Sequence, residues 1–209
     1  MLKRGEMELA YYHVDLDALA PQPESIQIQA YYIGVTNWLE LYAQRMAVDK
    51  DMTSVVLVGS LRLMSETPTK PDLVFGCRNM GGTPTTNNPP FSPINYRANS
   101  ANQSYYLCAA KTFFFDHDAH GRPKPPLIRL HASLGTPNWT VGLAERQKGI
   151  FGGAQALITP YLGALALYDG QDMIAGAMIR SVNTGLELRA GKFGDRWYVG
   201  LALDWPPPR

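Results

Sequence analysis

The densest group of side chains able to bind a metal lies in one short hydrophilic stretch. Asp116, His117, Asp118 and His120 bring two carboxylates and two imidazoles together, and divalent ions accept both as ligands. The stretch continues into Gly121 and several prolines, which is also the composition of an ordinary exposed turn. Both interpretations stay open at this point, and we expect no resident cofactor.

The chain lacks the residue patterns that would predict catalysis. His131 and Ser133 stand two apart on one strand face, but the Gly-x-Ser-x-Gly elbow that would expose a nucleophile is absent. Gly149, Gly152 and Gly153 are not followed by the Lys-Ser/Thr pair of a phosphate-binding loop. Glycine in a strand more often marks a bend or a close approach. We therefore predict no catalytic residue and no enzymatic activity.

The composition favours β-structure and argues against a nucleic-acid partner. The 209 residues include 19 Lys and Arg against 18 Asp and Glu, a formal net charge of +1, so there is no excess of base for a polyanion. Gly (19), Pro (16) and Tyr (11) are frequent, and the sequence contains no run of about 20 apolar residues that could form a membrane-spanning helix.

The start of the chain has no secretory signal pattern, which predicts a cytoplasmic protein or a chain whose leader is missing.

Alternation of apolar and polar residues, bounded by turn residues, recurs along the chain and predicts an all-β protein. In one such segment, Leu186 and Leu188 stand opposite Glu187 and Arg189. About twelve strands are expected, near 5–15, 25–34, 38–48, 54–65, 72–80, 104–115, 127–135, 149–158, 161–169, 172–181, 185–193 and 196–205.

This alternation fits two kinds of protein, one with an apolar interior and one with a polar interior. In a soluble sandwich or calycin-like barrel, binding a small ligand or sugar, the apolar faces point inward. In an outer-membrane barrel they point to lipid, and the polar faces line the lumen. The apolar face of 25–34 comprises Ile26, Ile28, Ala30 and Tyr32. Alternation alone does not decide between the two.

The lengths of the connections favour the membrane barrel. With both termini on one side, connections after odd-numbered strands lie on the far side, where outer-membrane barrels place their long loops. The longest connection, a polar loop over about 81–103, follows the fifth strand, and another over about 136–148 follows the seventh. Turns after even-numbered strands are short, except for 116–126. We therefore predict one antiparallel up-and-down transmembrane β-barrel domain over 1–209.

The last predicted strand resembles the C-terminal signature by which outer-membrane barrels are recognised for insertion. Tyr198, Gly200, Leu203 and Trp205 supply its aromatic, glycine and apolar positions, although Pro-Pro-Pro-Arg follows Trp205. Tyr and Trp also cluster near predicted strand ends, as interfacial aromatic girdles require. We expect outer-membrane lipid as a partner and, through this strand, the barrel-assembly machinery.

Eight polar-face residues are the candidate lumen-lining residues, because an unpaired charge facing lipid would cost about 2–4 kcal/mol at mid-depth. They are Glu40, Arg62, Arg78, Arg129, His131, Arg180, Glu187 and Arg189. Arginine is in excess, so one interpretation is a lumen that selects an anionic solute. The alternative is an interior filled by mutually neutralising pairs and hydrogen bonds.

The two cysteines, Cys77 and Cys108, lie on consecutive predicted strands. An oxidising periplasm would permit a disulfide between them. Two free thiols are the alternative, and neither cysteine belongs to a Cys-x-x-Cys pattern.

The Phe151-Gly152-Gly153 strand start and the Tyr168-Asp169-Gly170 hairpin are the most specific of several segments that carry a family resemblance. The segments are 33–45, 70–79, 127–135, 148–155, 166–179 and 184–193. Together they resemble the YjbH-type family of bacterial outer-membrane barrels, associated with exopolysaccharide production, although Leu167 replaces the usual acidic residue. The resemblance implies an outer-membrane pore or envelope scaffold linked to polysaccharide export. The family tends to be longer, so this chain would be a short relative or one barrel domain.

Overall fold

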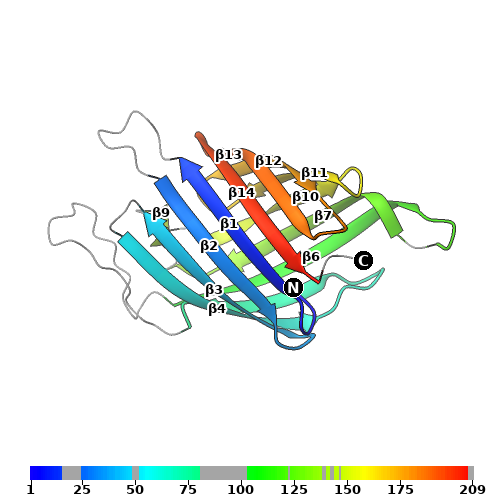
Figure 1. Cartoon of the computed structure of the whole chain (residues 1–209). Coiled ribbons are helices and arrows are strands. Elements are labelled where there is room, and N and C mark those ends of the chain that lie inside the picture. Colours follow the sequence, from blue (N-terminus) through cyan, green and yellow to red (C-terminus); the bar gives the residue numbers. More distant parts are fainter. Residues whose placement is uncertain are drawn as a thin grey trace.

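Twelve strands close into one antiparallel barrel (Figure 1). The structure, a computed structural model, describes residues 1–15, 25–48, 52–80, 103–121, 123–137, 140–141, 144–145 and 147–206. The barrel strands are β1 (Met7–Asp15), β2 (Ser25–Gly34), β3 (Leu39–Val48), β4 (Met52–Met64), β5 (Asp72–Arg78), β6 (Ser104–His117), β7 (Pro123–Gly135), β10 (Gly149–Leu157), β11 (Leu162–Tyr168), β12 (Met173–Arg180), β13 (Leu186–Phe193) and β14 (Arg196–Trp205). Each pairs with its neighbours along the chain, and β14 closes on β1. The predicted up-and-down barrel of about twelve strands is confirmed.

Both termini lie at one end of the barrel, called here the near end (Figure 1). Met7 at the start of β1 is the register partner of Trp205 at the end of β14. The connection from β5 to β6 is therefore at the opposite, far end, where the long polar loop was predicted. Residues 81–102 of that loop lie outside the described residues. Within the described ranges, no helix is long and apolar enough to cross a membrane.

Two connections differ from the predicted ones. A hairpin of β8 (Thr140–Val141) and β9 (Ala144–Glu145) lies between β7 and β10, apart from the barrel sheet; strands this short carry no readable alternation. The near-end connection predicted over 116–126 is mostly strand, because the β6–β7 ladder continues to the pair His117 and Pro123. The resulting hairpin extends beyond β5, whose ladder with β6 ends at Asp72 and Ala110.

The alternation of burial along the strands shows which face is inside. On β13, Leu188 is 54% exposed, whereas its neighbour Glu187 is 8% exposed. On β14, Val199 is exposed, and Tyr198 is buried. A soluble β-barrel would turn these apolar side chains inward. The orientation of the faces is therefore that of a barrel with an apolar exterior, and the soluble calycin- or sandwich-like alternative does not fit it.

Strand β2 is the exception to the expected orientation. Ala30 is buried, and Tyr32 packs against Tyr42 of β3 with ring centroids 4.7 Å apart. Tyr31 and Ile33 are the exposed residues. Ile28, Ala30 and Tyr32 of the apolar set predicted for 25–34 therefore face the interior. The outer face of β2 carries Tyr31 and Ile33 in its near-end half and glutamines in its far-end half, so both faces are partly apolar and the pairing with β1 and β3 determines which one is inside.

Inward tyrosines cover inward glycines at several places on the wall. A Cβ atom at Gly76 would overlap the ring of its cross-strand partner Tyr106. A Cβ atom at Gly200 would likewise overlap the ring of Tyr12 across the β1–β14 closure. Glycine at these positions lets a large ring lie flat against the barrel wall. Each ring thereby packs across two neighbouring strands.

Candidate functional site

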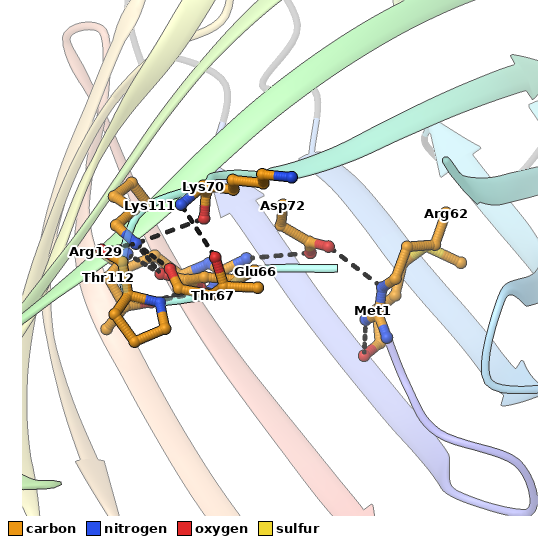
Figure 2. A network of polar contacts seen from close by, with 10 residues as sticks. Met1, Arg62, Glu66, Thr67, Lys70, Asp72, Lys111, Thr112 and Arg129 are labelled. Atoms are coloured by element: carbon orange, nitrogen blue, oxygen red, sulfur yellow. Dashed lines mark hydrogen bonds and ion pairs between the residues drawn. The ribbon is translucent and has the colours of Figure 1, made fainter. Parts of the chain in front are cut away.

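Charged side chains of the inner face gather into two groups on opposite parts of the wall. One group, called here the β4–β7 network, is drawn in Figure 2 and consists of Arg62, Glu66, Asp72, Thr112 and Arg129, joined by Lys111 from an outer-face position of β6. The other, called here the β13–β1 group, consists of Glu8, Tyr12, Glu187, Arg189 and Asp204. In the closed strand order β14 lies six positions from β6, so the two groups face each other across the barrel.

Asp72 lies between two arginines in the β4–β7 network (Figure 2). Arg62 Nε is 3.2 Å from Asp72 Oδ1, and Arg129 Nη2 is 3.4 Å from Asp72 Oδ2. The Asp72 side chain is only 7% exposed, so water screens these attractions weakly. Arg62 also donates through Nη2 to the backbone carbonyl of Met1 at 3.1 Å. Two arginines thus compensate one buried carboxylate at the first residue of β5.

Glu66, in the turn after β4, binds the edge of β6 just beyond the point where the β5 ladder ends. Its Oε1 accepts the backbone N–H of Thr112 at 2.5 Å, and its Oε2 accepts the Thr112 hydroxyl and Arg129 Nη1, each at 3.1 Å. Lys111 Nζ, 3.7 Å from Glu66 Oε1, donates to three carbonyls of the same turn, including Thr67. Partial burial raises the pKa of Glu66, but the Thr112 hydrogen bonds and the nearby cations outweigh it and hold that pKa below its ordinary value.

The β13–β1 group combines one ion pair with two carboxylates that, among the described residues, are not directly bonded to an opposite charge. Arg189 Nε binds Glu187 Oε1, and Arg189 Nη1 donates to the Tyr12 hydroxyl at 2.7 Å. Glu8 and Asp204 are direct cross-strand partners on β1 and β14, with both side chains inward. Over the part of the chain that the structure describes, neither carboxylate makes an ion pair or a hydrogen bond. Like charges directly opposite each other repel.

Arg78 is the most enclosed of the candidate lumen-lining cations. It is 3% exposed, and its guanidinium carbon lies 4.2 Å from the Tyr106 ring centroid and 5.6 Å from that of Phe151. Its Nη1 also donates to the Ser104 hydroxyl at 3.4 Å. Stacking of a guanidinium between rings is attractive, so Arg78 joins β5, β6 and β10.

The remaining predicted residues are spread over the wall. Glu40 is buried and accepts the Leu2 backbone N–H at 2.6 Å through Oε2. Arg180 Nε donates to the Pro160 carbonyl at 2.8 Å, and His131 is half-buried on the inner face of β7. All eight predicted residues thus lie on inner faces. Of these eight, Arg62 and Arg129 come together in the β4–β7 network, and Glu187 and Arg189 come together in the β13–β1 group. The lumen-lining role of the eight stays a prediction.

Four acidic residues of the inner wall were missed by sequence reasoning. Asp72 is the first residue of β5 and Glu66 lies in a turn, where no alternation assigns a face. Glu8 and Asp204 lie within β1 and β14. The signal for Asp204 was present, because it shares its face of the last strand with Tyr198. Counting these acids removes the arginine excess on which anion selection was argued.

The two aspartates among the candidate metal ligands make local contacts at the tip of the β6–β7 hairpin. Asp116 pairs with Lys124 at 3.1 Å and accepts the His117 backbone N–H at 2.8 Å. Asp118 accepts the His120 backbone N–H at 2.8 Å. Across the described residues, no group of three or more His, Cys, Asp or Glu side chains is arranged to hold a metal ion. The contacts are those of a polar turn.

The two cysteines are free thiols on opposite faces of neighbouring strands. Cys77 is the register partner of the exposed Tyr105, and Cys108 that of the buried Ser133. Because successive residues of a strand point to opposite faces, Cys77 faces outward and Cys108 inward. Of the two alternatives left open by the sequence, the structure has the free thiols.

Comparison with known proteins supports the fold and no narrower assignment. No protein-family model matches the chain, and no curated protein matches its sequence. Among solved structures, the chain is similar to the COG4313 outer membrane channel from Pseudomonas putida F1, with a TM-score of 0.50 and 14% sequence identity. The match covers 98% of this chain and 96% of that chain. The chain therefore has the fold of an outer-membrane channel.

Proposed function

We propose that the chain is an outer-membrane barrel that forms a pore for small polar solutes. The observation that carries the proposal is the orientation of β13, where Leu188 is 54% exposed and Glu187 only 8%. Large apolar side chains outside and charged side chains inside are what lipid and a watery lumen require. The shared fold with an outer-membrane channel supports the same function.

Exposed aromatic residues at both ends support a position across a membrane. Trp38, Tyr161 and Trp205 are exposed at near-end positions, and Tyr168 and Trp197 at far-end positions. Tyr and Trp prefer the interface between hydrocarbon and water, so these residues would form the two girdles of a membrane barrel. In this role the partners are outer-membrane lipid and, through the β14 signature, the barrel-assembly machinery.

Fractionation followed by conductance recording tests the proposal. The full chain, produced in a Gram-negative host, should stay in the outer-membrane fraction and enter solution only with detergent. The folded protein should then produce discrete conductance steps in planar lipid bilayers, whereas detergent buffer and heat-unfolded protein should not. Recovery in the aqueous supernatant would contradict the membrane location. A folded, inserted barrel without conductance would contradict the pore and leave an envelope scaffold.

The link to polysaccharide export is a narrower proposal that rests on the YjbH-type resemblance. It predicts that a strain lacking the chain secretes less exopolysaccharide and that the intact gene restores secretion. Secreted polysaccharide is measured as acid-hydrolysed sugar in the culture supernatant. Unchanged secretion would remove this link without affecting the conductance test.

A further inference from the structure

Among the described residues at the near end of the interior, the charges without a directly bonded opposite charge are mainly acidic. On the inner wall formed by β12, β13, β14 and β1, three carboxylates stand against three guanidinium groups, one of which, Arg196, lies at the far-end start of β14. Arg189 is neutralised by Glu187, and Arg180 is directed to the Pro160 carbonyl at the near end. Glu8 and Asp204 remain, partly exposed and without a bonded partner over the described ranges.

The opposite wall does not balance these two carboxylates. Arg62 and Arg129 both bind Asp72, and Arg129 also binds Glu66. Arg78 is enclosed between two aromatic rings and is only 3% exposed, so it presents little charge to a solute. A permeating ion would therefore meet acidic charge at the β1–β14 closure and compensated charge across from it.

We propose that the lumen conducts cations in preference to anions and that the Glu8–Asp204 pair sets this preference. The inference rests on the proposed pore function and specifies the class of solute. A wall charge of one sign concentrates ions of the opposite sign in a narrow passage. Two carboxylates placed directly opposite each other on adjacent strands repel unless a cation lies nearby, so a passing cation relieves that repulsion.

The test is the reversal potential of the full chain in planar bilayers under a KCl gradient. The wild type should give a K⁺/Cl⁻ permeability ratio above one. In the double variant Glu8→Gln/Asp204→Asn, the ratio should fall by a factor of about two to five, the scale of one unit charge acting at a few ångströms through water. Both substitutions keep side-chain size and remove repulsion, so the barrel should fold normally.

A matched control removes the same kind of charge away from the lumen. Asp195→Asn changes an exposed carboxylate in the turn between β13 and β14 and should leave the ratio unchanged. A wild-type ratio below one, or a ratio unaltered in the double variant, would overturn the cation preference while the pore stands. Absence of conductance from folded protein would overturn the pore and the preference with it.

Discussion

At the scale of single residues, the partners of each charge decide what the inner wall presents to a solute. The sequence supplies Arg62, Arg129 and Arg189 on polar faces, and from these alone the interior looks basic. In the structure each of the three is bonded to a carboxylate. Those carboxylates include Asp72 and Glu66, at a strand start and in a turn. Alternation cannot assign such positions to a face, so the contribution of Asp72 and Glu66 to the inner wall was not predictable from the sequence.

Asp72→Asn should destabilise the barrel more than its single lost charge suggests. The substitution leaves Arg62 and Arg129 facing each other without the buried carboxylate that both bind. We expect a loss of about 2–3 kcal/mol in unfolding free energy, at the low end for a broken buried ion pair because Arg129 is partly exposed. Urea unfolding of the refolded protein in detergent, followed by tryptophan fluorescence, measures this loss.

The exposed Asp195→Asn variant is the control for Asp72→Asn and should unfold at the wild-type urea concentration. Addition of salt should reduce the difference between Asp72→Asn and wild type only slightly, because Asp72 is buried. An Asp72→Asn midpoint equal to that of the wild type would show that the two arginines do not depend on this carboxylate.

At the scale of elements, strand positions were predictable, but not every face or end. The alternation of Leu186, Glu187, Leu188 and Arg189 gave the position and orientation of β13, because only one of its faces is apolar. On β2 both faces carry aromatic residues, so the side that packs inside depends on pairing with β1 and β3. The ends of β6 and β7 extend beyond their neighbours, and no local signal distinguishes such an extension from a loop.

The turn over 65–71 should loosen as the pH falls, and Glu66 should be the reason. Its pKa is lowered in the folded protein, so its stabilisation is fully present above the ordinary carboxyl pKa of about 4.3. It is lost as the pH falls through the lower folded value. Hydrogen exchange at the Thr112 amide, which Glu66 accepts, should therefore increase in acid after correction for the intrinsic pH dependence of exchange.

Glu66→Gln is the matched variant for this pH effect. It keeps an acceptor oxygen but removes the charge that attracts Arg129 and Lys111. Its Thr112 amide should exchange faster than wild type at pH 7, and the corrected rate should stay nearly level down to pH 3. A Thr112 amide that stays equally protected in both proteins at every pH would show that the Glu66 charge does not hold the turn.

At the scale of the whole molecule, the apolar content is placed on the outside. Apolar residues make up 45% of the chain, enough for a conventional core. Among the described residues, a small cluster around the buried Ala10, Ala30 and Ala202 is packed together on the β1, β2 and β14 wall. Large apolar side chains on β12 and β14, such as Ile179 and Val199, are exposed instead. Composition is the same for both arrangements, and only the alternation combined with loop lengths favoured the membrane barrel.

Leu188→Arg tests that arrangement directly. Leu188 is exposed on the outer face of β13, so in a bilayer the substitution places a guanidinium in hydrocarbon at a cost of about 2–4 kcal/mol near the midplane. The variant is folded into phospholipid vesicles, and its unfolding across a urea series is followed by the gel shift between folded and unfolded barrel. It should unfold at a correspondingly lower urea concentration than the wild type. Leu188→Ala, which leaves the face apolar, should lose much less stability. If the two variants unfold at the same urea concentration in vesicles, β13 does not face lipid. If their urea midpoints differ in vesicles but are equal in a detergent whose head groups reach the strand, the difference in stability is due to the hydrocarbon itself.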